Sequence, residues 1–307
     1  MDRVQILHGD FDAATGHAFN SVIADAVKVT ATNRVQILNG WFDPVTTEET
    51  VEWVTRWLQS GHRGYLCTIN VAILMMMTSA PWLQQFVDEA ALIVADGQPI
   101  VWASRLLSHA VPERVTGVDL IDALARQAEQ ERFRIYLLGA TAAVVQAAAQ
   151  SLQLKYPRLQ ICGFDDGYFS RADAPERVRA IRKSGAQILL VGMGVPRQEI
   201  FLQENLSNLG VNLAIPVGGS FDVIAGKKRR APRWMQEYGL EWLYRLLQEP
   251  QRLWKRYLVT NSQFIYHLLH KLLHLQLSWH KAELLRMKSK MTNSINETIS
   301  FYGIKVP

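Results

Sequence analysis

Short apolar runs rich in β-branched residues alternate with segments of helical spacing from residue 34 to about residue 217. Alternation of this kind indicates an α/β domain, because a helix usually carries the chain back between two parallel strands. The candidate strands are Val35–Leu38, Tyr65–Ile69, Ala91–Ala95, Arg134–Leu138, Leu159–Cys162, Gln187–Val191 and Asn212–Val217. The candidate helices between them include Gly117–Gln130, Ala142–Lys155, Pro175–Lys183 and Gln198–Leu209. The sequence therefore predicts a mostly parallel, Rossmann-like sheet flanked by helices.

Polar and glycine-rich residues follow five of these candidate strands. In open parallel sheets, ligands bind at the carboxyl ends of the strands, so a functional site is expected where these residues gather. The five segments are Thr68-Ile-Asn70, Asp96-Gly97, Gly139-Ala-Thr141, Gly192-Met-Gly194 and Gly218-Gly-Ser220.

Composition is that of a globular protein and not of a membrane-spanning one. The 307 residues are 49% hydrophobic and 20% charged, and the longest apolar run, Val71–Met77, is far shorter than the ~20 residues that span a bilayer. We expect no transmembrane helix. The first thirty residues lack the basic start and apolar block of a secretory signal, so we expect a cytoplasmic protein. Cys67 and Cys162 lie in strand-like stretches, and we predict two buried thiols.

The chain divides into three parts by pattern. A segment near the start, Arg3–Asp12, recurs almost unchanged as Arg34–Asp43, and only the second copy continues into the α/β pattern. We therefore predict an N-terminal extension over residues 1–33 and an α/β core over 34–226. A basic, helical appendage and tail is expected over 227–307.

Positive charge is concentrated in that last part. Between Lys227 and Lys290 there are fourteen Lys or Arg residues against four Glu, although the whole chain carries a formal charge of only +5. Such asymmetry favours an anionic partner, which is a membrane surface, a diphosphate or a nucleic acid. No recognition helix, zinc finger or RNA-binding motif accompanies the charge, so we do not expect nucleic acid.

Two helices are expected in the basic part, one over Trp234–Gln248 and one from Pro250 to beyond His274. On the second helix, one side carries Arg252, Arg256, Gln263, His267, His270 and His274, and the opposite side carries Trp254, Tyr257, Leu258, Ile265, Leu268, Leu269 and Leu272. Cations beside aromatic residues are what an interfacial membrane helix needs. The structural alternative is a solvated charged face whose apolar side packs on a partner helix.

Asp96 is the first candidate for chemistry, because a carboxylate at a strand end can take a proton from a sugar hydroxyl. Its position also suits an N-cap for a helix starting near Gln98. Thr68 and Asn70 are able to hydrogen-bond a nucleotide sugar or orient Asp96, and a turn or cap role is equally compatible with their positions.

Glycines support a second candidate, an anion cradle. The segment Gly192–Glu199 follows a strand and opens a helix, so its free amides favour a diphosphate. It lacks the complete glycine patterns of dinucleotide sites and of P-loops. Gly218 and Gly219 form either a second cradle or a tight turn. His267, His270 and His274 have ligand-like spacing without partner ligands, so we predict no metal site.

Nine motifs in order resemble the WecG/TagA/CpsF glycosyltransferase family over roughly residues 34–260. They are Thr68-x-Asn70, Ala95-Asp-Gly-Gln-Pro-Ile100, Pro112-Glu-Arg-Val-Thr-Gly117, Tyr136-Leu-Leu-Gly139, Gly192-x-Gly-x-Pro-Arg-Gln-Glu199, Val217-Gly-Gly-Ser-Phe-Asp-Val-Ile-Ala-Gly226, Arg230-Ala-Pro-Arg-Trp234, Gly239-Leu-Glu-Trp-Leu-Tyr-Arg245 and Glu249-Pro-x-Arg252. The chain departs from the family pattern at Ile69, where Pro is common, and at Arg197, where Lys is frequent.

The resemblance implies an inverting, metal-independent transfer, without a cofactor, of an N-acetylmannosamine-type sugar. The implied donor is a UDP-sugar, and the implied acceptor is a polyprenyl-diphosphate-linked N-acetylglucosamine at the cytoplasmic face of the membrane. Asp96 is then the expected base, and Thr68 helps to place it. The expected donor-binding residues are Asn70, Arg114, Gly139, Gly192, Gly194, Gln198, Gly218 and Gly219.

The resemblance also implies that the basic appendage closes over the site at the membrane and neutralises the diphosphate. The residues expected in this role are Arg230, Arg233, Arg245, Arg252, Lys255 and Arg256. Two other readings of the sequence stay open, namely a catalytically idle UDP-sugar-binding scaffold and a basic nucleic-acid-binding protein. The sequence also leaves open whether the protein is a monomer or a homo-oligomer.

Overall fold

The computed structural model describes residues 34–108 and 110–301, so the predicted extension over residues 1–33 lies outside the described residues. Its centre is a six-stranded, all-parallel sheet with strands in the order β4-β3-β8-β7-β5-β6. The strands are β3 (Gly64–Ile69), β4 (Leu92–Ala95), β5 (Arg134–Gly139), β6 (Gln160–Asp165), β7 (Ile188–Gly192) and β8 (Leu213–Pro216). The predicted α/β fold with a parallel sheet is confirmed.

The first candidate strand does not join this sheet. Instead, β1 (Val35–Ile37) pairs with β2 (Gly40–Phe42) in an antiparallel hairpin, whose three-residue second strand the sequence analysis missed. Asp43, just after the hairpin, accepts a hydrogen bond from the Ile93 backbone N–H at 2.8 Å. The hairpin is thereby attached beside the edge strand β4.

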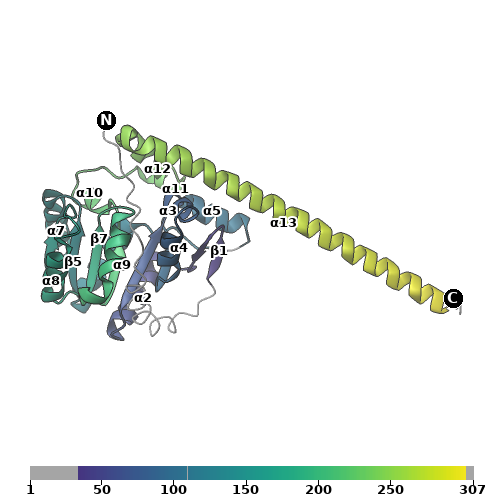
Figure 1. Ribbon diagram of the computed structural model, residues 1–307, viewed down its shortest axis with the longest axis horizontal. Helices are drawn as coiled ribbons and strands as arrows, with labels where there is room; N and C mark the ends of the chain where they lie inside the picture. Colours follow the sequence, from purple (N-terminus) through teal and green to yellow (C-terminus); the bar gives the residue numbers. More distant parts are fainter. Residues whose placement is uncertain (1–33, 109, 302–307) are drawn as a thin grey trace.

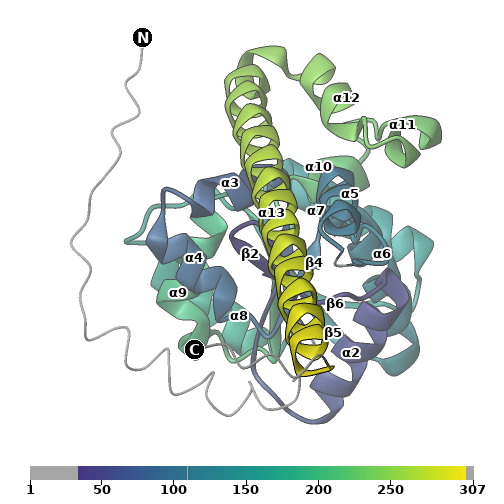
Figure 2. The same cartoon turned by 90° about the vertical axis from the view of Figure 1, so that its right-hand side faces the viewer.

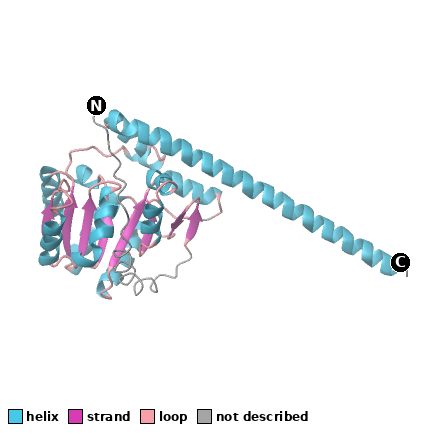
Figure 3. Cartoon of the chain, viewed as in Figure 1, coloured by secondary structure: helices cyan, strands magenta, loops and turns pink. Residues whose placement is uncertain are grey.

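Helices cover both faces of the sheet, as Figure 3 shows with the strands enclosed between helices. One face packs against α2 (Thr47–Gln59), α6 (Gly117–Glu131), α7 (Ala142–Lys155) and α10 (Ser220–Ile224). The other face packs against α3 (Val71–Met77), α4 (Pro81–Asp88), α5 (Gln98–Leu106), α8 (Ala174–Ser184) and α9 (Arg197–Leu209). A separate apolar core therefore fills each side of the sheet.

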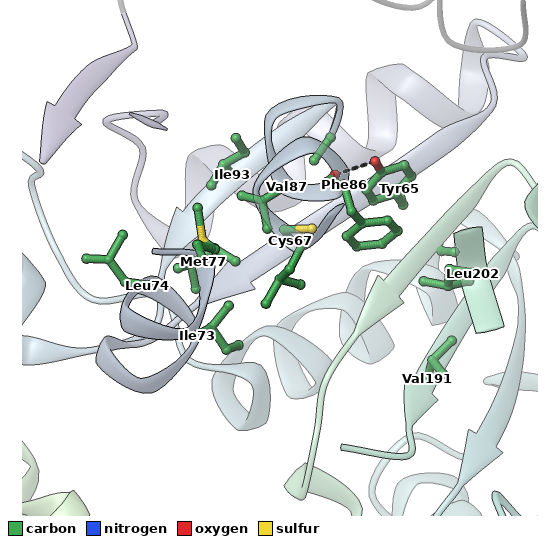
Figure 4. Close-up of a cluster of buried hydrophobic side chains, with 14 of the residues drawn as sticks. Tyr65, Cys67, Ile73, Leu74, Met77, Phe86, Val87, Ile93, Val191 and Leu202 are labelled. Atoms are coloured by element: carbon green, nitrogen blue, oxygen red, sulfur yellow. Dashed lines mark hydrogen bonds between the residues drawn. The ribbon is translucent and has the colours of Figure 1, made fainter. Parts of the chain in front are cut away.

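The core under α3 and α4 includes three residues of β3, namely Tyr65, Cys67 and Ile69, and Figure 4 labels the first two. The Tyr65 hydroxyl donates a hydrogen bond to the Phe86 carbonyl, and the two rings stack with centroids 4.4 Å apart. Cys67 is buried, as predicted. The prediction of a buried thiol is wrong for Cys162, which is only partly buried because β6 is an edge strand.

The appendage begins after α10, and its described part, as far as residue 301, contains three helices. Where one helix was expected over Trp234–Gln248, the structure has α11 (Arg233–Glu237) and α12 (Glu241–Gln248). Gly239 separates them with a φ of +62°, and a Cβ there would lie 2.8 Å from the Trp102 ring. Helices commonly end at a residue with a left-handed backbone conformation, and glycine adopts that conformation with the least strain.

The last helix, α13 (Pro250–Phe301), has 52 residues and is about 78 Å long at the usual rise per residue. It packs across α3 and then extends beyond the body of the protein (Figures 1 and 2). Its continuation past His274 is confirmed. None of the helices in the described part of the chain is long and apolar enough to cross a membrane.

The side of α13 that faces the core differs from the predicted apolar side. Leu253, Thr260 and Phe264 are buried, and Leu268 and Leu272 pack against the same core. The remaining residues of the predicted apolar side divide between the cavity described below and solvent. Trp254, Leu258, Ile265 and Leu269 are exposed, each with 48–62% of its surface accessible. Helical spacing alone predicted one broad apolar side. The helix instead carries two apolar stripes, one packed against the core and one exposed to solvent.

Candidate active site

A cavity of about 380 Å³ lies at the carboxyl ends of the strands, where the sequence analysis expected a site. The ends of β3, β4, β5, β7 and β8 line one side, and residues of the appendage between Lys228 and Asn261 line the other. The predicted site residues that line it are Thr68, Asn70, Asp96, Arg114, Gly192, Gly194, Gln198, Gly218, Gly219, Arg230, Arg245, Arg252 and Arg256. The cavity has the size of a typical small-molecule site.

Three predicted site residues do not line the cavity. Gly139 lies behind it, with a φ of +140°, and a Cβ there would be 2.4 Å from the carbonyl carbon of Gly192. This glycine permits close contact between two strand ends, and it does not face the ligand space. Arg233 is exposed and pairs with Glu237, and Lys255 lies beside the Trp254 ring.

Asp96 follows β4 and lies in the cavity wall. Its backbone N–H donates to the Ile69 carbonyl at 2.8 Å, which fixes it beside the end of β3. The N-cap interpretation of Asp96 is wrong, because α5 starts at Gln98 with Gly97 as its N-cap and with no side-chain capping bond. Among the described residues, no side chain forms a hydrogen bond or ion pair with this carboxylate. It is therefore available to a ligand.

Burial raises the pKa of Asp96 to about 7. The positive charges of Arg245 and Arg114 lower it, and the negative charges of Glu241 and Asp119 raise it. A carboxyl group with a pKa near neutrality is a stronger base than an ordinary aspartate, and it is still largely ionised above pH 7. Both properties suit a group that removes a proton from a hydroxyl.

Thr68 and Asn70 lie at the end of β3, beside the end of β4 that carries Asp96. The Thr68 hydroxyl is buried and donates to the Pro216 carbonyl at 3.1 Å, which joins the ends of β3 and β8. Asn70 is the N-cap of α3, with Oδ1 accepting from the Ile73 N–H at 3.2 Å. The cap role of Asn70 is confirmed, and its Nδ2 makes no hydrogen bond with the described residues.

Gln198 holds two glycine loops together. Its Oε1 accepts hydrogen bonds from the backbone N–H groups of Gly194 and Gly218, each at 3.1 Å. Its Nε2 donates to Glu199 Oε1 at 2.8 Å. Burial raises the pKa of Glu199 to about 7, although the hydrogen bond from Gln198 lowers it. The side chain of Gln198 is thus held by three hydrogen bonds inside the protein, and it shapes the cavity through the two loops.

Positive charge dominates the cavity wall. Seven Lys or Arg side chains line it, against four Asp or Glu side chains. The cations are Arg114, Lys228, Arg229, Arg230, Arg245, Arg252 and Arg256, and the carboxylates are Asp96, Asp222, Glu241 and Glu249. An anionic ligand is therefore favoured over a neutral one.

Most of the arginines are already paired. Arg230 forms two hydrogen bonds of 2.5 Å with Asp119, and Arg114 pairs with Glu241 at 2.8 Å. Arg256 has no carboxylate partner among the described residues, and its Nε is buried without a hydrogen bond. Burial lowers the pKa of Arg256, as it does for any cation that loses water.

The sequence analysis missed several residues that line the cavity. These are the aromatic side chains Tyr168, Trp242 and Tyr257, and the acidic side chains Asp222, Glu241 and Glu249. Glu241 and Glu249 belong to motifs quoted above, so their positions carried a signal. From these two motifs, the sequence analysis assigned a role only to the arginines, Arg245 and Arg252.

The three candidate histidines, which lie on α13 with His280, are away from the cavity. His267, His270 and His274 are exposed and contact one another or Tyr266 by their rings. Within residues 34–108 and 110–301, no group of three or more His, Cys, Asp or Glu side chains could hold a metal ion.

A family model described as "Glycosyl transferase WecG/TagA/CpsF family" matches residues 35–277, which is most of the chain. The chain belongs to the WecG/TagA/CpsF family of glycosyltransferases. The match includes the sheet, the cavity and the part of α13 that packs on the core.

Relatives of this WecG/TagA/CpsF glycosyltransferase have names that specify a sugar and an acceptor. A Staphylococcus aureus protein named N-acetylglucosaminyldiphosphoundecaprenol N-acetyl-beta-D-mannosaminyltransferase is 33% identical over 227 residues, which cover 73% of this chain and 87% of that protein. A Bacillus spizizenii protein of the same name is 31% identical over 204 residues, covering 66% of this chain and 78% of that protein.

The raised pKa of Asp96 predicts a pH-dependent gain in stability on substitution. Because the folded-state pKa lies above the unfolded value, ionisation of Asp96 destabilises the fold progressively as the pH rises from about 4 to about 7. Asp96→Asn, which stays neutral, should raise the melting temperature at pH 8 by on the order of 2–4 °C, and the gain should vanish near pH 4.5. Thermal unfolding followed by circular dichroism measures this.

Asp122→Asn is the matched control, since Asp122 is an exposed carboxylate paired with Lys155 on the surface. It should give no gain that grows with pH. A melting temperature of the Asp96→Asn protein that is no higher at pH 8 than that of the parent would contradict the burial argument.

Proposed function

We propose that this glycosyltransferase moves an N-acetylmannosamine-type sugar from a UDP donor to a polyprenyl-diphosphate-linked N-acetylglucosamine, with inversion at the transferred carbon. The observation that carries the proposal is the unpaired Asp96 carboxylate in a cavity lined by seven cationic side chains. The names of the two relatives support the sugar and the acceptor.

The reaction is a single displacement. Asp96 accepts the proton of the acceptor hydroxyl as the oxygen attacks the anomeric carbon of the donor sugar. The bond between that carbon and the UDP oxygen breaks, and UDP leaves with the bonding electron pair. Attack on the face opposite UDP inverts the configuration, so one carboxylate is sufficient and no second nucleophile is required.

Negative charge develops on the leaving diphosphate and needs fixed positive charge. The loops held by Gln198 bring the backbone of Gly192–Gly194 and Gly218–Gly219 to the cavity wall. Arg245, Arg252 and Arg256 approach from the appendage. Preorganised amide dipoles and guanidinium groups stabilise such charge without reorganisation. We therefore propose a transfer that proceeds without a metal ion.

A membrane surface is the proposed location of the acceptor. The exposed stripe Trp254, Leu258, Ile265 and Leu269 lies on α13, next to the cavity residues Arg252 and Arg256. Exposed apolar side chains along one side of a helix, beside cations, are typical of a helix that lies in the interface of an anionic membrane. We propose that the protein binds peripherally to the cytoplasmic face of the membrane through this stripe.

Sugar transfer can be measured as UDP release from a panel of UDP-sugars in the presence of a short-chain polyprenyl-diphosphate-N-acetylglucosamine. We expect release from UDP-N-acetylmannosamine or a close relative, with the same rate in EDTA. Asp96→Asn should lower the rate by about 10²–10⁴-fold, the usual contribution of a general base, while UDP still binds.

The Asp122→Asn control should keep the full rate. A full rate in the Asp96→Asn protein would exclude Asp96 as the base. UDP binding with no turnover of any donor would instead favour the scaffold alternative.

Membrane binding can be tested by co-sedimentation with vesicles that contain anionic phosphatidylglycerol. The double variant Leu258→Gln, Ile265→Gln removes two leucine-sized apolar contacts, and we expect binding at least about tenfold weaker. Neither side chain packs in the core, so folding should be unaffected.

Leu154→Gln is the matched control, because Leu154 is an exposed leucine on α7 outside the appendage. It should bind vesicles like the parent. Unchanged binding of the double variant would show that another surface contacts the membrane.

A further inference from the structure

Two glutamates of the appendage occupy the cavity wall among the arginines. Glu241, at the start of α12, accepts from Arg114 Nη1 at 2.8 Å through one oxygen and from Arg245 Nη2 at 3.2 Å through the other. Arg114 precedes α6 in the α/β part of the chain, whereas Arg245 lies one turn further along α12. One carboxylate thus bridges the two sides of the cavity.

Glu249, next to the start of α13, also binds two cations, but both of them belong to the appendage. Its Oε2 accepts from Arg252 Nη2 at 2.6 Å and from Lys228 Nζ at 3.1 Å. Both glutamates line the cavity, and both face two cations that also line it. Glu237 forms the contrasting pair: it contacts Arg233 on the outside of the appendage, away from the cavity.

The ion pairs of Arg245 and Arg252 are accessible enough to exchange, whereas the Arg114–Glu241 pair is largely buried, with Arg114 only 13% exposed. The side chain of Glu241 is 12% exposed and that of Glu249 is 28% exposed, and Arg245 and Arg252 are 44% and 66% exposed. A partly hydrated carboxylate binds a guanidinium only weakly in net terms. A diphosphate carries more charge and more acceptor oxygens, and the planar guanidinium group bonds it in bidentate fashion. It can therefore displace a carboxylate from the same donors.

We propose that Glu241 and Glu249 are displaceable internal counter-ions, which neutralise the cavity arginines while the cavity is empty and yield them to the phosphates of the substrate. Glu241 in addition holds the appendage against the α/β part through Arg114. The two glutamates are positioning residues that act through Arg114, Arg245 and Arg252. Their return to these arginines opposes retention of the diphosphate product. The inference rests on the proposed function only in taking the ligand to be a diphosphate.

The test is the affinity of the full chain for two probes, UDP and inorganic pyrophosphate, measured by calorimetry. Glu241→Gln and Glu249→Gln keep the shape of the side chain and remove the competing charge. Each variant should bind both probes about fivefold more tightly, as expected for the loss of one competing carboxylate from the cavity. A residue that served only to brace the appendage would weaken binding when replaced.

Glu237→Gln is the matched control, because it removes the same charge from the same appendage outside the cavity. Its affinity should equal that of the parent. Equal tightening in all three variants would mean a general charge effect and would overturn the inference, as would unchanged or weaker binding in both cavity variants. If one cavity variant fails to fold, the affinity of the other cavity variant for UDP and pyrophosphate decides the test.

The proposed function and this inference fail in distinguishable ways. If the parent protein binds neither UDP nor pyrophosphate, the cavity is not a diphosphate site and both fail. If the parent binds them and the two cavity variants are not tighter, only the role of Glu241 and Glu249 is wrong.

Discussion

Parallel pairing of six strands is the constraint on which the site depends, because it brings every strand's carboxyl end to one edge of the sheet. Residues that are far apart in sequence, such as Thr68, Asp96 and Gly218, become neighbours there. Close contact between Gly139 and Gly192 lets two of the strand ends approach each other. The sheet supplies only one side of the cavity, and the appendage has to supply the other.

The two sides of the cavity, the strand ends and the appendage, contribute different charges to it. The strand ends contribute Asp96, whose ionisation burial disfavours, and the appendage contributes most of the cations. Cations near an aspartate lower its pKa, and the nearby carboxylates partly cancel this effect. Glu241 has both roles, since it raises the pKa of Asp96 and binds Arg114 and Arg245. The same few groups thus shift the pKa of Asp96 and neutralise the cations of the cavity.

Local pattern predicted the ends of five of the six sheet strands to within one residue, because β-rich runs followed by Gly, Asp or Asn mark where a parallel strand stops. It failed for β6, which continues through Gly163 to Asp165, beyond the predicted end at Cys162. It could not separate Arg230 from Arg233, which lie on either side of Pro232, one facing the cavity and the other solvent. It also gave Gly139 a ligand role, although that glycine is required by close packing. The two apolar stripes of α13 were merged, since periodicity does not reveal which stripe meets the core.

We propose that the two sides of the cavity, the strand ends and the appendage, hold one ligand between them. Hydrogen exchange of the full chain with and without UDP tests this proposal. Exchange is expected to slow on UDP binding both in the loop Gly192–Val195 and in the appendage from Glu241 to Arg256. Protection confined to the strand-end loops, with exchange in the appendage unchanged, would contradict it.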